Sequence, residues 1–177
     1  TNVRDIGGWP LPRGRRIRQG LIYRTSEMNS HMAITEEGKK LLTDTLGIRT
    51  DLDLRGEAEE IGAVLDPTRV KWVHAPIGPY QHIRSDKSKA SFRRIFSLFA
   101  NRSRYPIMFH CWGGADRGGS LAFLLNALLG KSMKHLEQDY ELTSLAIWGE
   151  RSRHSVEFQL FMETLRSFGN GSARVVN

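Results

Sequence analysis

The sequence predicts an α/β fold with a central, mostly parallel sheet of about four or five strands flanked by helices. Short apolar runs that are typical of strands alternate with segments whose apolar residues recur at helical spacing. One such run, 105–109, leads through a glycine-rich loop into a long apolar helix candidate, 121–129. No repeat or low-complexity linker divides the 177 residues. We therefore expect a single domain over residues 1–177 with a full hydrophobic core.

Turn residues and short apolar stretches define the elements of the N-terminal half. Residues 1–20 are rich in Gly, Pro and Arg and are predicted to form an extended arm, followed by a short strand at 21–23. Thr35 is predicted to cap a helix that ends near Gly47, because acidic residues fill the first turn and glycine commonly follows a helix end. The remaining predictions for this half are strands at 48–54 and 70–75, a short helix at 57–61 and a loop at 76–85.

Helical spacing dominates the C-terminal half. Apolar residues between 92 and 99 recur at this spacing and predict a buried helical face. The run 121–129 is apolar on all sides, so its helix should be central and should end at Gly130. Ser132 is predicted to cap the next helix, and the apolar pattern of 156–168 predicts the last one.

The loop between the predicted strand and the long helix contains the only cysteine, Cys111, separated by five residues from Arg117. A thiol attacks well only as thiolate, and a helix N-terminus and a nearby cation both favour that form. Backbone amides of such a loop can surround a tetrahedral anion, and Gly113 and Gly114 permit the tight turn that this requires. Arg117 can bind two oxygens at once. This combination suits phosphoryl transfer through a cysteinyl-phosphate.

Such a reaction also needs a proton donor for the leaving oxygen. Asp116, inside the loop, is the nearest candidate, and Asp53, at the end of a predicted strand, is the second. Carboxyl ends of parallel strands meet at one edge of a sheet, so both carboxylates can reach one crevice. The alternatives are that Asp116 caps the helix and that Asp53 holds Arg55 or a backbone turn. His110 is expected to orient the loop by hydrogen bonds.

The loop resembles the H-C-x-x-G-x-D-R-x-G signature of the bacterial tyrosine phosphatase family, which is related to dual-specificity and phosphoinositide phosphatases. Three further segments resemble motifs of that family in the same order: 2–8 (N-x-R-D-x-G-G), 20–26 (G-x-x-Y-R-S) and 46–55 (L-G-I-x-x-x-x-D-L-R). The resemblance implies a cysteine phosphatase-like α/β fold that needs no metal or organic cofactor. It also implies that Cys111 is the nucleophile, Arg117 the phosphate binder and Asp116 the acid.

The predicted site follows from the loop and these segments. The catalytic residues are predicted to be Cys111, Arg117 and Asp116. The residues that bind phosphate or substrate are predicted to be Trp112, Gly113, Gly114, Ala115, Gly118, Asp53, Arg24 and Arg4. Two interpretations of Arg4 and Arg24 remain open: they flank the phosphate, or they pair structurally with Asp5 or Asp53.

Two positions depart from the family pattern. Many members carry lysine where this chain has Ala115, and that lysine is associated with acidic lipid or multiply phosphorylated substrates. Its absence disfavours a phosphoinositide substrate. Most members carry threonine or serine where this chain has Gly118, and that hydroxyl is thought to help the sulfur leave. Its absence predicts slower turnover unless Ser120 compensates.

The sequence therefore predicts a cysteine-dependent phosphomonoesterase of the tyrosine phosphatase type, with dual specificity for phosphoserine and phosphothreonine left open. The alternatives are a phosphoinositide or inositol phosphate phosphatase, a phosphate-binding pseudophosphatase and a sulfurtransferase. The expected partner is a phosphorylated protein or a small phosphomonoester, which the net charge of +7 would attract. No nucleic-acid motif is present, so no nucleic-acid partner is expected. No apolar run reaches the length of a membrane span, so we expect a soluble protein, cytoplasmic or secreted, of undetermined oligomeric state.

Overall fold

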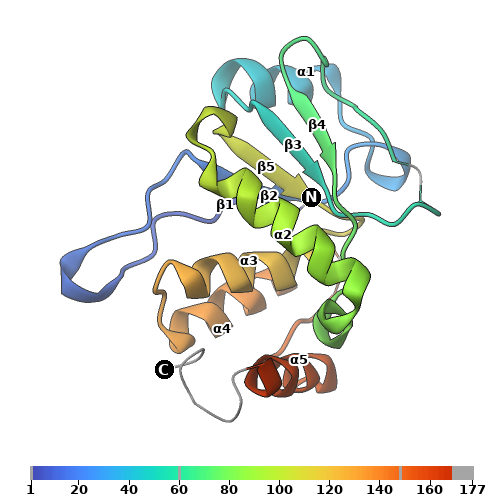
Figure 1. The fold of residues 1–177 in the computed structure, drawn as a ribbon. Coiled ribbons are helices and arrows are strands. Elements are labelled where there is room, and N and C mark those ends of the chain that lie inside the picture. The colour runs from blue at the N-terminus through green and yellow to red at the C-terminus, as the bar shows by residue number, and fades with distance from the viewer. Residues whose placement is uncertain (1, 60, 148, 169–177) are drawn as a thin grey trace.

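The computed structural model describes residues 2–59, 61–147 and 149–168. A five-stranded sheet forms its centre, with the strands in the order β1-β2-β5-β3-β4. Strand β1 is antiparallel to β2, and the other neighbours are parallel. This arrangement confirms the predicted, mostly parallel sheet (Figure 1). The strands are β1 (Arg4–Asp5), β2 (Ile22–Thr25), β3 (Thr50–Asp53), β4 (Lys71–His74) and β5 (Ile107–His110).

Helices account for much of the rest of the described chain. The α-helices are α1 (Glu36–Lys40), α2 (Asp86–Ala100), α3 (Arg117–Leu128), α4 (Met133–Glu141) and α5 (Val156–Phe168). A π-helical turn, Leu41–Thr45, continues α1. Short 3₁₀ segments lie at Pro12–Gly14, Ser30–Met32, Tyr80–Arg84, Arg102–Arg104 and Leu142–Leu145. Within the described residues, no helix is both long enough and apolar enough to cross a membrane.

Both faces of the sheet are covered, because consecutive residues of β5 pack into different apolar clusters. Phe109 belongs to the larger cluster, which includes Leu121 of α3 and residues of α2, α4 and α5. Met108 belongs to a smaller cluster with Leu42, which follows α1, and Ile48. Figure 1 shows α2 and α3 against one face of the sheet. Side chains of successive strand residues point to opposite faces, so the two clusters mark the two layers.

The predicted helix ends are confirmed by their local geometry. The Thr35 side chain accepts a hydrogen bond from the Gly38 amide at 3.1 Å, and Ser132 accepts one from the amide of a residue in the first turn of α4. Gly47 and Gly130, which follow the helical segments, have φ values of 64° and 90°. These left-handed conformations are readily adopted by glycine and explain why the helices end there.

Three local predictions were wrong or incomplete. Residues 57–59 form a turn rather than the start of a helix, and Glu60 lies outside the described residues. Residues Tyr80–Arg84 form a 3₁₀ helix rather than a loop. The arm over 1–20 contains β1, whose Arg4 is in register with Arg24 of β2. Two residues cannot signal a strand by periodicity, so this strand depends on its pairing.

Candidate active site

Cys111 follows directly on β5, and α3 begins six residues later at Arg117. All of β5 is buried, and the Cys111 side chain is only 2% exposed. Strand β3 pairs with β5 so that Asp53 lies opposite His110. The sheet therefore brings Asp53 and the loop 111–116 to the same edge, as the sequence predicted.

Two side chains hold the loop from behind by binding the carbonyl oxygen of Gly114. Asn2 Nδ2 donates to this oxygen at 3.0 Å, and Arg24 Nη2 donates to it as well. The C=O and N–H of one trans peptide point in opposite directions, so the amide of Ala115 points away from these two side chains. Gly114 itself has a φ of +65°, and a Cβ there would lie 2.5 Å from the carbonyl oxygen of Thr25. Only glycine fits this position.

The contacts of Arg4 and Arg24 differ from the pairing with Asp5 or Asp53 that was one of the two interpretations. Arg24 is 1% exposed, and burial together with the charge of Arg4 lowers the pKa of Arg24 to about 10. Arg4 donates to the carbonyl oxygen of Asp139 at 3.0 Å and to Thr143 Oγ1 at 3.2 Å. Asp5 instead accepts hydrogen bonds from the backbone amides of two glycines, Gly7 and Gly20. In the described contacts, Arg24 thus supports the loop and Arg4 ties β1 to α4.

Arg117 is held by a carboxylate that the sequence prediction did not include. Its Nη2 donates to Glu59 Oε1 at 2.8 Å, and its Nη1 donates to Glu59 Oε2. Burial disfavours the charge of Arg117, but the hydrogen bonds to Glu59 and the electrostatic interaction with Cys111 outweigh this effect and raise the pKa of Arg117. Glu59 uses two of the five guanidinium donors, so three remain for another ligand.

Asp116 lies at the N-cap position of α3, but its side chain makes no capping hydrogen bond. Its Oδ1 instead accepts a hydrogen bond from the Tyr80 hydroxyl at 2.6 Å and one from Arg151 Nε at 3.2 Å. The Asp116 side chain is 44% exposed, so solvent reaches it. Tyr80, Asp116 and Arg151 line a cavity of about 360 Å³ beside the loop. The Asp116 side chain therefore does not cap α3.

Asp53 is fully buried and bound to Arg55, as one of the alternatives from the sequence stated. Asp53 Oδ1 accepts from the Arg55 amide and Nε at 3.0 Å each, and Asp53 Oδ2 accepts from Arg55 Nη2 at 2.8 Å. Arg55 Nη1 also lies 3.2 Å from Glu27 Oε2. His110 Nε2 lies 3.1 Å from Asp51 Oδ1 and its Nδ1 3.9 Å from Asp53 Oδ1. These contacts make Asp53 part of a buried charged cluster under the loop.

The structure shows what surrounds Gly118 and Ala115, the two residues that depart from the family pattern. A Cβ added at Gly118 would meet Cys111 Sγ at 3.7 Å, which is an ordinary contact. Ser120 does not offer a substitute hydroxyl, because its Oγ donates to the carbonyl oxygen of Asp116 at 2.9 Å and accepts from the Tyr80 amide at 3.0 Å. Ala115 is buried, at 3% exposure.

Trp112, directly after the cysteine, is the partly exposed aromatic residue of the loop. It is 37% exposed, and its Nε1 donates to His31 Nδ1 at 3.0 Å. The two rings meet edge to face with their centroids 5.2 Å apart. Glu27 Oε1 in turn accepts from the His31 amide at 3.0 Å. This chain of contacts fixes an aromatic surface at one side of the loop.

The residues of this arrangement that were absent from the predicted site include Asn2, His31, Glu59, Tyr80 and Arg151. Asn2 lies within a segment that resembles a family motif, which is the signal that could have identified it. Tyr80 lies in the segment 76–85, whose counterpart in the family lies near the active site, and the others contact the loop through the tertiary fold. Among the residues that the structure describes, no group of three or more histidine, cysteine or acidic side chains is arranged to hold a metal ion.

A cysteine at the end of a parallel strand, an arginine at the start of the next helix and a loop bound from behind define the cysteine-phosphatase type of α/β fold. The sequence signature of the tyrosine phosphatase family matches residues 1–170. The chain belongs to the tyrosine phosphatase family.

Known proteins agree with this assignment. A protein of Cupriavidus necator that is named a tyrosine-protein phosphatase is 28% identical over 164 residues, which cover 79% of this chain and 59% of that protein. The chain thus spans 59% of the length of this curated relative. The core catalytic domain of the Saccharomyces cerevisiae PP-IP phosphatase Siw14 has a similar fold, with a TM-score of 0.62 and 18% identity over 97% of this chain and 94% of that chain. Tk-PTP in its active form aligns with a TM-score of 0.50 and 17% identity over 85% of this chain and 92% of that chain.

Proposed function

We propose that this protein is a cysteine-dependent phosphomonoesterase that hydrolyses phosphotyrosine through a cysteinyl-phosphate. The observation that carries the proposal is the loop from Cys111 to Arg117, whose Gly114 carbonyl is bound from behind by Asn2 and Arg24. This geometry directs loop amides to the other side before any substrate arrives. Preorganised donors of this kind stabilise the charge that develops on a transferring phosphoryl group.

In the proposed reaction, different residues in and around the loop carry out different steps. The Cys111 thiolate attacks phosphorus while the bond to the leaving oxygen breaks, and Asp116 donates the proton that the leaving oxygen takes up. Arg117 binds the phosphoryl oxygens with the donors that Glu59 leaves available. A water molecule then attacks the cysteinyl-phosphate, Asp116 accepts its proton, and thiolate and inorganic phosphate are released.

The choice of Asp116 over Asp53 as the acid rests on exposure and on hydrogen bonding. Asp53 is 0% exposed and accepts three hydrogen bonds from Arg55, so its carboxylate is held ionised and away from substrate. Asp116 is partly exposed beside the loop, where a leaving group can reach it. The hydroxyl of Tyr80 fixes its orientation.

Two features of the loop favour phosphotyrosine over phosphoinositides as the substrate. Trp112 and His31 offer a fixed aromatic surface on which a phenyl ring can pack. Ala115 contributes no cation for additional phosphate groups. A phosphorylated protein is therefore the proposed substrate, and phosphoserine and phosphothreonine remain secondary candidates.

The test measures phosphate release from p-nitrophenyl phosphate and from a phosphotyrosine peptide, with the unmodified chain and Cys111→Ser side by side. We expect the serine variant to lose activity on both substrates. Equal activity of the two proteins would contradict the cysteinyl-phosphate. Tight phosphopeptide binding by the unmodified chain without any release of phosphate would instead indicate a phosphate-binding module. Faster release from inositol phosphates than from the peptide would overturn the choice of substrate.

The role of Asp116 is tested separately by comparing substrates that have different leaving groups. p-Nitrophenolate leaves readily without a proton, whereas an alkoxide needs one. Asp116→Asn should therefore lose far more activity on an alkyl phosphate than on p-nitrophenyl phosphate. An equal loss on both substrates would assign Asp116 to the structure of the loop rather than to proton transfer.

A further inference from the structure

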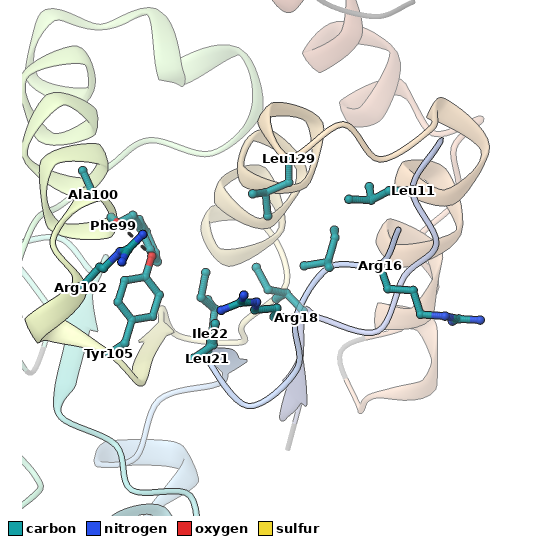
Figure 2. A pocket seen from close by; sticks show the side chains of 12 residues that line it. Leu11, Arg16, Arg18, Leu21, Ile22, Phe99, Ala100, Arg102, Tyr105 and Leu129 are labelled. Atoms are coloured by element: carbon teal, nitrogen blue, oxygen red, sulfur yellow. Dashed lines mark hydrogen bonds between the residues drawn. The ribbon is translucent and has the colours of Figure 1, made fainter. Parts of the chain in front are cut away.

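A groove lies at the end of the sheet opposite the Cys111 loop. It has a volume of about 700 Å³ and lies between the arm that precedes β2 and the segment that joins α2 to β5 (Figure 2). Ile22 begins β2 and Tyr105 precedes β5, and both line the groove, whereas Cys111 follows the far end of β5. Since β2 and β5 run parallel, the groove and the loop lie at opposite ends of the same two strands. The groove is therefore separate from the proposed active site.

Most of the groove surface is apolar. Leu11 and Ile22 line the wall formed by the arm and β2, Phe99 lines the opposite wall, and Leu129 lies at the end of α3. Leu129 is 45% exposed, so part of this apolar surface faces water. The volume is within the range of sites that bind small molecules, which is about 300–1,000 Å³.

The charges that line the groove all have one sign. Its charged lining residues are Arg16, Arg18 and Arg102, and no carboxylate is among the lining side chains. Within the described ranges of the chain, Arg18 and Arg102 make no ion pair or side-chain hydrogen bond. Figure 2 shows Arg18 extending across the opening toward the wall that carries Tyr105 and Arg102, whereas Arg16 points away.

The apolar surface of the groove surrounds the two arginines and also extends away from them. In Figure 2, Arg102 lies beside Phe99 and Tyr105, and Arg18 lies beside Ile22. Leu11 and Leu129 line the part of the groove away from Arg102. A ligand that matches this pattern has one anionic end and one apolar end. An extended peptide fits less well, because its backbone carries polar groups at every residue and an apolar wall would leave them unpaired.

We propose that this groove binds a monomeric anionic amphiphile, a single acyl chain with a carboxylate head. The carboxylate lies between Arg18 and Arg102, and the acyl chain lies along the apolar surface toward Leu129. The head supplies charge complementarity to two arginines that have no partner in the described chain. The tail removes from water the apolar surface of the arm and of the α2–β5 segment.

Calorimetric titration of the full chain with straight-chain carboxylates below their self-association concentrations tests the proposal. Hexanoate, octanoate and decanoate form the series, with acetate and decanol as the probes that lack one of the two ends. Each added methylene should raise the affinity about fourfold, because a buried methylene contributes about 0.8 kcal/mol. Decanol should bind about fivefold more weakly than decanoate, since exposed ion pairs contribute up to about 1 kcal/mol. Added salt should weaken decanoate binding and leave decanol binding unchanged.

Variants assign the two ends of the ligand. The double variant Arg18→Gln with Arg102→Gln should reduce decanoate binding to the level of decanol, and Leu129→Glu should weaken both ligands at least tenfold. Arg13→Gln is the matched control, because Arg13 is an exposed arginine of the same arm that does not line the groove. All variants should keep the far-UV circular dichroism spectrum and the urea unfolding midpoint of the unmodified chain, which verifies their folding.

Several outcomes would overturn the proposal. Affinity that does not increase with chain length would show that the groove does not bind the acyl chain. Decanol binding as tightly as decanoate would show that the groove does not recognise the anionic head. An equal loss of decanoate affinity in Arg13→Gln and in the double variant would show that the overall positive charge, rather than the groove, attracts the carboxylate. Binding to phosphatidylglycerol vesicles without binding of monomeric decanoate would indicate a membrane surface, and tighter binding of a glutamate-rich peptide would indicate a protein partner. The titration does not depend on catalysis, so it stands even if the proposed phosphatase activity fails its own test.

Discussion

Replacing Gly118 by serine tests the proposed second half-reaction. A Cβ at this position lies 3.7 Å from Cys111 Sγ, so the side chain fits without displacing the loop. The hydroxyl oxygen is one bond further out and can donate a hydrogen bond to the sulfur as it leaves phosphorus. Hydrogen bonds to charged groups contribute about 1.5–3 kcal/mol. If the bond forms fully in the transition state, hydrolysis of the cysteinyl-phosphate should be at least about tenfold faster.

Rapid-mixing kinetics with p-nitrophenyl phosphate separate this step from the first one. The unmodified chain should release a fast burst of p-nitrophenolate, close to one per molecule, followed by slow turnover. Gly118→Ser should raise the steady-state rate and reduce the burst. Gly118→Ala is the matched control, since it adds the same Cβ without the hydroxyl. Equal steady-state rates for the alanine and serine variants, with no burst in the unmodified chain, would refute the reasoning.

Three further changes test the surroundings of the loop. Arg55→Met leaves the buried Asp53 without its cation and should lower the free energy of unfolding by about 3–5 kcal/mol in urea denaturation; an unchanged midpoint would contradict the assigned ion pair. Burial disfavours the charged form of His110, but two neighbouring aspartates outweigh this effect and raise the pKa of His110. The stability that His110 adds is therefore fully present below its unfolded pKa of about 6.5 and is lost as the pH rises through the folded pKa. Urea midpoints measured across this range should fall with rising pH, and this dependence should weaken in His110→Asn. Tyr80→Phe removes the hydrogen bond to Asp116 and should reduce activity on alkyl phosphates about tenfold while sparing p-nitrophenyl phosphate; equal losses would remove Tyr80 from the proton-transfer step.

The sequence predicted the features that depend on neighbouring residues. The caps at Thr35 and Ser132 and the glycine ends at Gly47 and Gly130 each involve only a few consecutive residues, and all four are confirmed. The strand that leads into Cys111 was predicted for a similar reason, because an apolar run before a glycine-rich loop is a local pattern. The mostly parallel direction of the strands followed from the alternation of strands and helices, whereas the strand order did not.

Features that depend on distant residues were not predictable in the same way. Strand β1 exists through its pairing with β2, and the 3₁₀ helix at Tyr80–Arg84 is anchored by the bond from the Tyr80 amide to Ser120 across 40 residues. Glu59 and Arg117 are separated by 58 positions, and no spacing rule relates them. A carboxylate that is free in a surface turn and a carboxylate that holds a distant arginine look the same in a sequence.

Arg24 illustrates why the role of a residue is harder to predict than its place. The resemblance placed this arginine near the loop, and its Nη2 donates a hydrogen bond to the Gly114 carbonyl oxygen. Burial lowers the pKa of Arg24 to about 10, which still leaves it charged near neutral pH. A charged donor on a carbonyl polarises that peptide and strengthens the adjoining amide as a donor. The role proposed for Arg24 is therefore to hold the loop in a geometry that a substrate does not have to organise.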